Sequence, residues 1–343
     1  MTPVFPALFE KLQRQEDLTE AEAAAAMGRI MDGDVPAAQV AGLLIALRQK
    51  GERPAEIVGF ARTMRARAVP LARPRPDALD TCGTGGDGAN TFNISTVAAI
   101  VVASCGVAVA KHGNRSASSR CGSADVFEAL GVDVAAGPGV AEACLAEAGL
   151  AFFFAPTYHP SMRHVAALRR ELGVRTAFNL LGPLTNPAGA RRQIVGVPRP
   201  ELTELVAKAL GMLGSERAWV VHGADGLDEI STTGYTKVSE ARGGSVRTFY
   251  VHPADAGLPK ASLSDLAGGD AAENAAIARR ILSGVTGPGR DIVLLNAGAA
   301  LLVAGAAASL AEGISRAAAA IDRGAAAATL EQLIATSHHG ASI

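Results

Sequence analysis

Apolar side chains in the first 70 residues recur at the three- and four-residue spacing that is typical of amphipathic helices. The pattern is clear in four segments, which lie at 8–12, 23–31, 40–47 and 57–64. Each helix of this kind buries only one face, so short helices have to pack on one another. The pattern therefore predicts a small helical domain over residues 1–70, which ends at a proline-containing connector at 71–76.

Beyond the connector, short apolar runs alternate with stretches of helical periodicity. The runs lie at 107–110, 151–154, 194–197 and 219–221, and the helical stretches lie near 95–105, 138–148, 161–172 and 200–213. This alternation is typical of an α/β domain built on a central, largely parallel sheet. We therefore expect an α/β domain over residues 71–343, with a helical segment near 161–190 completing the first domain. Residues 235–239 and 247–251 flank a Gly-Gly turn and predict a hairpin.

The C-terminal part, 271–334, is rich in alanine but carries recurring Leu, Ile and Val, which predicts three or four packed helices. Its apolar stretch at 292–310 has about the length of a membrane span. Alanine and glycine dominate that stretch, and Asn296 interrupts it. A buried helix is therefore the better interpretation.

The net charge and the spacing of the cysteines limit the binding partners and the cellular compartment that we expect for this chain. With 343 residues and a formal net charge of −1, the chain has no global basic excess for nucleic acid or a membrane surface. Its four cysteines show no C-x-x-C spacing, and its N-terminus has no signal-peptide pattern. We therefore expect a cytoplasmic protein with reduced thiols, no nucleic-acid or membrane partner, and anion sites that are local.

The most informative stretch is 80–96, where four glycines lie within the six residues from Gly83 to Gly88. Glycine tolerates positive φ and lets a ligand approach the main chain. A helix expected from about Ser95 offers unpaired N–H groups and the positive end of its dipole. Together these features predict a turn that binds phosphate.

The same segment fits the G-x-G-x-x-G pattern of dinucleotide-binding folds, which has little specificity by itself. A dinucleotide site also needs an acidic residue about 20 positions further on, and no Asp or Glu occurs between Asp87 and Asp125. A P-loop needs Lys-Ser or Lys-Thr after the last glycine, where this chain has Ala89 and Asn90. Neither nucleotide-binding template fits.

A basic, hydroxyl-rich turn at 111–120 follows the apolar run at 107–110. A basic cluster by itself is typical of a solvated surface. A strand that ends here would deliver Lys111 and Arg115 to a cleft beside the glycine turn, which favours a second anion-binding loop. His112 and His159 are candidates for substrate contact, although a lone histidine more often has a structural role.

Asp228 and Glu229 lie just past the run at 219–221, where the sites of α/β enzymes form. Mg²⁺ is held by few carboxylates together with substrate phosphates, so the pair is a candidate for one or two ions. On the predicted helix 161–172, Arg169 shares the apolar stripe of Val165, and its planar guanidinium suits a carboxylate ligand. Considered alone, the acid pair also fits a solvated turn. Considered alone, Arg169 also fits an arginine whose aliphatic stem covers the edge of the core.

The segments 80–96, 111–125, 179–187 and 228–229 together resemble, in order and spacing, the anthranilate phosphoribosyltransferases of tryptophan biosynthesis. The third segment is too irregular for a helix and too rich in proline for a strand, so we expect a shaped loop there. The resemblance covers nearly the whole chain. It implies transfer of the phosphoribosyl group of phosphoribosyl pyrophosphate (PRPP) to the amine of anthranilate, with two Mg²⁺ ions per subunit and a homodimer joined through the helical domain.

The resemblance also assigns residues by position. PRPP would contact Gly83, Gly86, Asp87, Thr91, Asn93, Ile94, Ser95, Thr96, Lys111, His112, Gly113, Asn114, Arg115, Ser116, Ala117, Ser118, Ser119 and Ser123. Anthranilate would contact Gly83, Asn114 and Arg169, and the metal would be held by Ser95, Asp228 and Glu229. Because the aromatic amine is already neutral at pH 7, no strong base is required, and positioning by Arg169, Asn114 and Lys111 would supply much of the acceleration.

Two alternatives remain at this point. Pyrimidine nucleoside phosphorylases share this fold and are similar in the first two segments, but they use phosphate without a metal and would leave the pair Asp228 and Glu229 without a purpose. The other alternative is a binding module that keeps the PRPP site without catalysing transfer. The presence of Asn114 and Arg169 argues against it.

Overall fold

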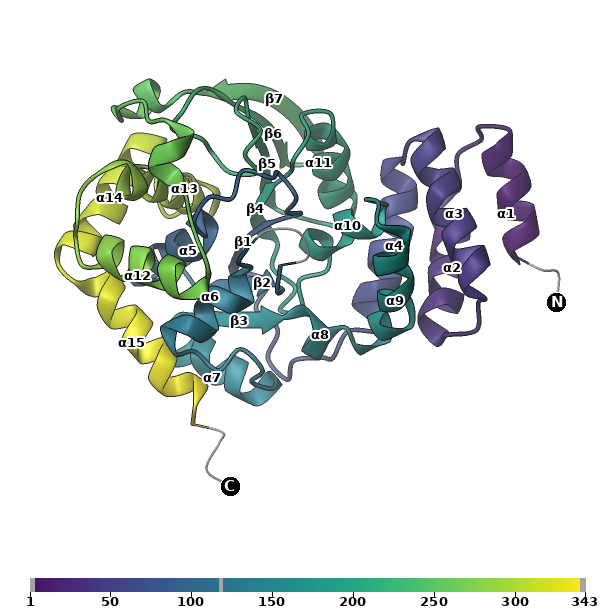
Figure 1. Ribbon diagram of the computed structural model, residues 1–343, viewed down its shortest axis with the longest axis horizontal. Coiled ribbons are helices and arrows are strands. Elements are labelled where there is room, and N and C mark those ends of the chain that lie inside the picture. Colours follow the sequence, from purple (N-terminus) through teal and green to yellow (C-terminus); the bar gives the residue numbers. More distant parts are fainter. Residues whose placement is uncertain (1–3, 117–119, 340–343) are drawn as a thin grey trace.

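The computed structural model describes residues 4–116 and 120–339, and it shows a helical lobe beside a larger α/β body (Figure 1). The lobe begins with α1 (Val4–Gln13), α2 (Glu20–Asp32), α3 (Ala37–Lys50) and α4 (Pro54–Ala66). Local signals set their ends: Thr19 and Glu22 form a capping box at the start of α2, and Gly33 takes the left-handed conformation after its last turn. The predicted bundle of helices is confirmed.

The α/β body is built on a seven-stranded sheet in the order β3-β2-β1-β4-β5-β6-β7. The strands are β1 (Leu79–Gly83), β2 (Val109–Gly113), β3 (Leu150–Phe154), β4 (Arg192–Gly196), β5 (Arg217–Gly223), β6 (Thr236–Arg242) and β7 (Ser245–Val251). Strands β1 to β5 run parallel, and β6 and β7 form the predicted antiparallel hairpin. The predicted fold class, a small helical domain with a larger α/β domain on a largely parallel sheet, is confirmed.

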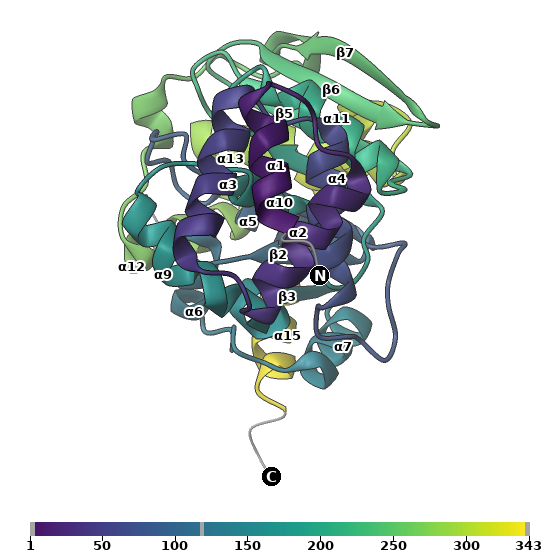
Figure 2. The same ribbon diagram turned by 90° about the vertical axis from the view of Figure 1, so that its right-hand side faces the viewer.

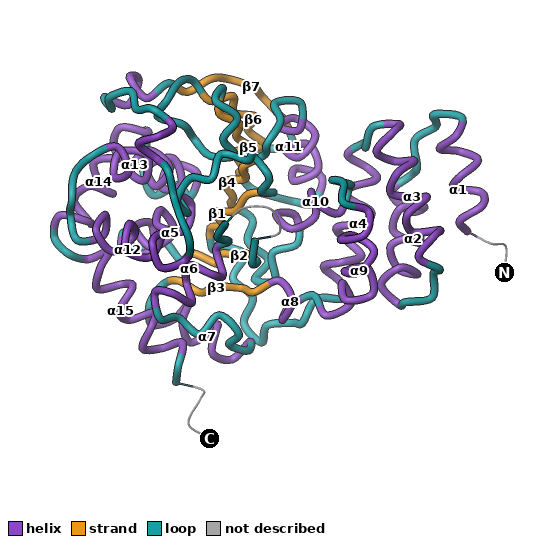
Figure 3. The backbone as a smooth tube through the Cα atoms, in the orientation of Figure 1, coloured by secondary structure: helices purple, strands orange, loops and turns teal. Residues whose placement is uncertain are grey.

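Helices cover the sheet on both faces (Figure 3). On the face away from the helical lobe, α5 (Ile94–Ser104) and α13 (Pro288–Val303) contact the strands, and the other C-terminal helices, α12 (Ala271–Leu282), α14 (Leu310–Asp322) and α15 (Ala325–Ser337), pack on these two. The prediction of three or four helices in this part is confirmed. The apolar stretch at 292–310 is not one helix: it lies in α13 as far as Val303, and α13 is buried between α5 and α14, where the stretch ends. Within the described residues, no helix has the length and apolar character that crossing a membrane requires.

On the opposite face, α11 (Leu202–Met212) packs on β5 and β6 and also contacts α4. Its buried Val206 and Leu210 belong to the same apolar core as Leu44 of α3 and Val220 of β5. The helical lobe and the sheet therefore share one continuous core through α11, with the lobe standing in front of the sheet in Figure 2.

Between β3 and β4 the chain crosses to the helical lobe and returns. It forms α8 (Ala155–Tyr158), α9 (Arg163–Leu172), which packs beside α2 and α3, and α10 (Phe178–Leu181), which packs beside α4. The prediction of a loop over 179–187 is wrong in its first half, which contains the end of α10 and the 3₁₀ turn Gly182–Leu184. Pro183 fits such a turn because the first residues of a helix have no partner for their N–H groups.

Two further differences affect the candidate site. The run predicted at 107–110 is displaced, because β2 continues to Gly113 and so carries Lys111 and His112 on the strand itself. The sequence pattern also misses β1, where Asp80 and Thr81 interrupt the apolar residues, and α6 (Ser123–Leu130). The remaining predicted helix near 138–148 is α7 (Pro138–Glu147).

The order of the strands determines where the candidate site lies. β1 pairs with β2 on one side and with β4 on the other, so the connections leave β1 and β4 in opposite directions. α/β proteins bind ligands at the carboxyl ends of the strands at such a point. The glycine turn follows β1, the basic turn follows β2, and the acid pair follows β5. The sheet thereby gathers the three predicted segments at one edge.

Candidate active site

A cavity of about 760 Å³ lies at this edge, between the sheet and the helical lobe. All predicted site residues that the structure describes line it, namely Gly83, Gly86, Asp87, Thr91, Asn93, Ile94, Ser95, Thr96, Lys111, His112, Gly113, Asn114, Arg115, Ser116, Ser123, Arg169, Asp228 and Glu229. The predicted residues Ala117, Ser118 and Ser119 lie outside the described residues. Segments that are far apart in the sequence therefore meet around one space.

The glycine turn needs its glycines for two separate reasons. Gly85 and Gly86 have φ values of 65° and 80°, which L side chains rarely adopt. A Cβ on Gly83 would lie 2.6 Å from Asp228 Oδ2, so any side chain there would displace that carboxylate. The turn thus approaches the acid pair, and Gly85 N donates a hydrogen bond to Asp228 Oδ2 at 3.0 Å.

The acid pair is held by the backbone of the two predicted phosphate-binding elements. Glu229 Oε1 accepts a hydrogen bond from Ser95 N, in the first turn of α5, at 3.0 Å. Burial raises the pKa of Asp228, and the nearby charge of Asp87 raises it further. Burial, followed by the charge of Asp228, raises the pKa of Glu229. Three acidic side chains are therefore crowded on one wall of the cavity.

This wall fits Mg²⁺. Crowded carboxylates repel one another, and a divalent cation at the wall relieves that repulsion. Among the described residues no three His, Cys, Asp or Glu side chains converge as a complete ligand set. Mg²⁺ does not require such a set, because it is commonly bound by one or two carboxylates and completed by substrate phosphates and water. Asp87 is part of the crowding, and its Oδ1 also accepts a hydrogen bond from Ala89 N at 3.2 Å.

Lys111 brings a buried positive charge to the same wall. Its Nζ donates to the carbonyl oxygen of Thr81 and to Ser95 Oγ, the latter at 3.3 Å. Burial lowers the pKa of Lys111. The buried carboxylate of Asp80 accepts hydrogen bonds from His112 N at 3.1 Å and from Asn186 Nδ2 at 2.8 Å. Asp80 and Asn186 thus fix the strand that carries Lys111 without reaching the cavity.

Comparison with known proteins agrees with this arrangement. Residues 75–327 match the model of the glycosyl transferase family α/β domain, and residues 6–68 match the model of that family's helical bundle domain. The chain is 60% identical over 295 residues to the anthranilate phosphoribosyltransferase of Moorella thermoacetica, covering 86% of this chain and 87% of that protein. It belongs to the anthranilate phosphoribosyltransferase family. The resemblance drawn from the sequence, and the enzyme class that it implies, are confirmed.

Solved structures of the family have the same fold over nearly their full length. The Thermus thermophilus enzyme superimposes with a TM-score of 0.90 at 48% identity, covering 96% of this chain and 99% of that one. The anthranilate phosphoribosyltransferase of Saccharomyces cerevisiae in complex with PRPP and Mg gives a TM-score of 0.89 at 30% identity, covering 98% of each chain.

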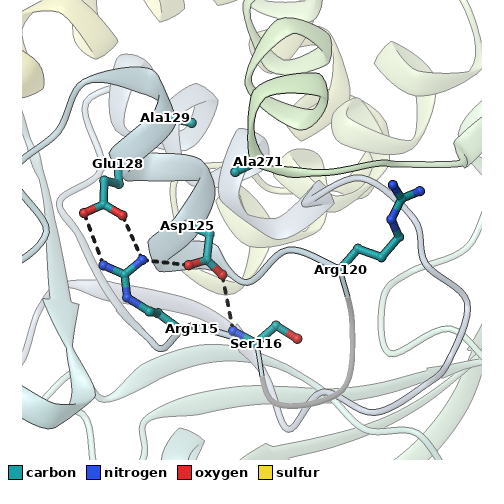
Figure 4. A pocket seen from close by; sticks show the side chains of 7 residues that line it. All are labelled: Arg115, Ser116, Arg120, Asp125, Glu128, Ala129 and Ala271. Atoms are coloured by element: carbon teal, nitrogen blue, oxygen red, sulfur yellow. Dashed lines mark hydrogen bonds and ion pairs between the residues drawn. The ribbon is translucent and has the colours of Figure 1, made fainter.

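In this member of the family, Arg115 differs from the other predicted site residues in the partners of its side chain. Its guanidinium points to α6, where Nη1 lies 2.8 Å from both Asp125 Oδ1 and Glu128 Oε2 (Figure 4). Asp125 also accepts hydrogen bonds from Ser116 N at 3.4 Å and Gly122 N at 2.8 Å. The side chain of Arg115 is thus engaged in anchoring the turn, and the residue also lines the cavity.

Arg169 faces the cavity, as the helical spacing predicts, and the neighbouring Arg170 is exposed. The guanidinium carbon of Arg169 lies 5.9 Å from the ring centre of Phe178, and burial lowers the pKa of Arg169. Sequence reasoning did not assign several polar residues that also line the cavity, among them Arg175 and Asn179. Neither belongs to a periodic pattern, because both lie in or near the irregular connection between α9 and α10.

His112 and His159 form a buried pair of rings with centres 5.2 Å apart. Their nitrogens bond to backbone oxygens, His112 Nδ1 to Gly182 O at 2.9 Å and His159 Nε2 to Thr185 O at 3.0 Å. Burial, and the charge of His159, lower the pKa of His112 to about 3. Burial lowers the pKa of His159 to about 4. Both rings are therefore neutral at pH 7.

The free energy of unfolding is expected to fall as the pH drops below 6.5, the ordinary pKa of both histidines. Their folded pKa values lie below the unfolded ones, so their stabilising contribution is complete above pH 6.5 and is lost as the pH falls towards the folded values. His159→Gln keeps a donor for Thr185 O but cannot titrate. Urea denaturation at several pH values should show that the free energy of unfolding of this variant falls less steeply with decreasing pH than that of the wild type, by up to about 1.4 kcal/mol per pH unit. Parallel curves for the two proteins contradict the assignment.

Proposed function

We propose that this chain transfers the 5-phosphoribosyl group of PRPP to the amine of anthranilate, giving N-(5-phosphoribosyl)anthranilate and pyrophosphate in tryptophan biosynthesis. The observation that carries the proposal is the hydrogen bonding of Asp228 to Gly85 N and of Glu229 to Ser95 N, beside a cavity that Arg169 also lines. The two carboxylates that we propose bind metal are thereby hydrogen-bonded to the backbone of the glycine turn and of the start of α5. A nucleoside phosphorylase has no use for such a pair.

We propose that Ser95, Asp228 and Glu229 hold Mg²⁺, with two ions per subunit. The two carboxylates support two positions because they bond to different elements, Asp228 to the glycine turn and Glu229 to the start of α5. The yeast relative was solved in complex with PRPP and Mg. When bound, Mg²⁺ neutralises the charge that grows on pyrophosphate as it leaves.

The residues of the chain itself bind and orient PRPP in this proposal. The turn around Gly86 offers backbone N–H groups to phosphate oxygens, and Lys111 adds a fixed positive charge. The donors are held in place by the sheet before the reaction begins, so they need no reorganisation as charge develops.

Anthranilate is placed by Gly83, Asn114 and Arg169 in this proposal, with the guanidinium of Arg169 paired to its carboxylate. The amine of anthranilate is neutral at pH 7 and attacks the anomeric carbon of the ribose directly. Correct placement of two bound substrates removes much of the entropy cost of their meeting. We also propose a homodimer joined through the helical domain, on the strength of the resemblance. A domain division near residue 70, at the proline-containing connector, and a cytoplasmic location are proposed from the sequence.

Replacing Arg169 with alanine is expected to raise the KM for anthranilate about 10- to 100-fold, the equivalent of roughly 1.5–3 kcal/mol for a hydrogen bond to a charged group. The KM for PRPP should change little. Steady-state kinetics with each substrate varied in turn provides the measurement. Arg170→Ala, on the exposed side of the same helix, is the matched control. Unchanged anthranilate kinetics in Arg169→Ala would show that this residue does not bind the carboxylate.

One assay separates the proposed function from its alternatives. The full-length protein is incubated with anthranilate, PRPP and Mg²⁺, and the loss of anthranilate fluorescence is followed. A second incubation contains thymidine and phosphate without added metal. Turnover in the first mixture supports the transferase, turnover only in the second supports a phosphorylase, and PRPP binding without turnover supports a binding module.

A further inference from the structure

Arg175 reaches the glycine turn from the helical side of the cavity. It lies in the connection between α9 and α10, is partly buried, and lines the cavity. Its Nη2 donates a hydrogen bond to Thr84 O at 3.2 Å. A Cβ on Gly86 would lie only 1.7 Å from Arg175 Nη1, so the guanidinium rests directly on the bare backbone of Gly86. This close packing is a third reason for glycine in the turn.

The charge of Arg175 is not neutralised by a direct ion pair. Within the described residues no carboxylate oxygen lies within 4.0 Å of it, and its one hydrogen bond is to Thr84 O. A guanidinium carries five N–H donors in a rigid fork, so most of those of Arg175 make no hydrogen bond to the described residues. Burial lowers the pKa of Arg175, but an arginine stays protonated at neutral pH. The side chain is therefore a partly desolvated cation with free donors.

We propose that Arg175 binds the pyrophosphate group of PRPP and stabilises it as it leaves. This inference rests on the proposed function and names a residue beyond those that the resemblance assigns. In the reaction the bond between the anomeric carbon and the pyrophosphate oxygen breaks, and its electron pair stays on that oxygen. The lone pair of the anthranilate amine forms the new bond to carbon, and the nitrogen then releases a proton to solvent. Arg175 remains protonated and donates hydrogen bonds to the leaving group.

The position of Arg175 favours pyrophosphate over the carboxylate of anthranilate. The guanidinium lies on Gly86, and the charges of Asp228 and Asp87 act on it through space. A simple carboxylate is repelled beside those acidic groups. A pyrophosphate group arrives with Mg²⁺, which offsets the same repulsion. Arg169, on α9 and near Phe178, is the arginine available to anthranilate.

The test measures pyrophosphate binding directly. Isothermal titration of pyrophosphate with Mg²⁺ into the full-length protein compares wild type, Arg175→Gln and Arg175→Lys. Glutamine keeps a donor for Thr84 O but loses the charge, and lysine keeps the charge but loses the fork. We expect the Kd for pyrophosphate to rise about tenfold or more in Arg175→Gln and less in Arg175→Lys. Arg170→Gln, exposed on α9, should match the wild type.

Steady-state kinetics supplies the second readout. In Arg175→Gln the KM for PRPP should rise and kcat should fall, each about 10- to 100-fold, while the KM for anthranilate stays within about twofold. Equal pyrophosphate affinity in wild type and Arg175→Gln overturns the proposal. A rise confined to the KM for anthranilate overturns it as well. If wild type binds pyrophosphate but does not consume anthranilate, the proposed function fails, and the titrations still decide whether Arg175 binds pyrophosphate.

Discussion

Replacing Glu229 with glutamine is expected to lower kcat about 10²- to 10³-fold at saturating substrates, the range for losing one group that stabilises developing charge. Glutamine has nearly the same shape and can still accept the hydrogen bond from Ser95 N, which is 3.0 Å from Glu229 Oε1. The fold should therefore survive while the negative charge offered to Mg²⁺ is lost. Initial rates measured over a range of Mg²⁺ concentrations test this, because the concentration for half-maximal activity should rise.

Asp228→Asn should act in the same direction, since Asp228 holds the other position on the acidic wall. Glu216→Gln is the control, because its side chain is 41% exposed and pairs with arginines outside the cavity. An unaltered dependence on Mg²⁺ in both Glu229→Gln and Asp228→Asn would show that these carboxylates do not hold the metal.

Replacing Gly196 with alanine is expected to damage both stability and activity. Gly196 ends β4, and a Cβ there would lie 1.6 Å from the backbone oxygen of Asp228 and 2.5 Å from its carbonyl carbon. Backbone atoms at these distances have to move. Overpacking of this kind typically costs about 1–3 kcal/mol of unfolding free energy, and a shift of about 1 Å at the acid pair can cost about 10² in rate.

The matched control is Gly234→Ala. A Cβ at Gly234 would meet no heavy atom within 4 Å, and the residue does not adopt a positive φ. This variant should therefore unfold like the wild type and keep its activity. Urea denaturation and initial rates measured on both variants provide the comparison. Wild-type stability and turnover in Gly196→Ala would show that the turn carrying Asp228 moves aside freely.

The parts of the site that follow from the sequence are those with local patterns. The glycines from Gly83 to Gly88, the acid pair after β5 and the spacing of Arg169 from Val165 can each be interpreted from a few neighbouring residues. Propensity and periodicity are local properties, so they identify such features well.

The rest depends on distant contacts. Asp80 makes β1 look too polar for a central strand, and its burial becomes reasonable through hydrogen bonds from Asn186, which is 106 positions away, and from His112 N. The short helix α10 and the 3₁₀ turn after it are stabilised by packing, because isolated helices of this length are unstable in water. Arg175 has no periodic neighbours, and its contacts with Thr84 and Gly86, which are distant in the sequence, place it at the site.

The hydrogen bond between Gly85 and Asp228 also bears on how the chain folds during synthesis. It joins residues 143 positions apart, and β1 finds its partner β4 only when Arg192 and the residues after it are available. Contacts of such long range form late, because the entropy of closing a long loop has to be overcome first. The helices before residue 70 contact one another across much shorter separations in the sequence, as α2 and α4 do, and can pack earlier. We therefore expect nascent chains released before residue 228 to contain folded helices but no cavity able to hold a metal.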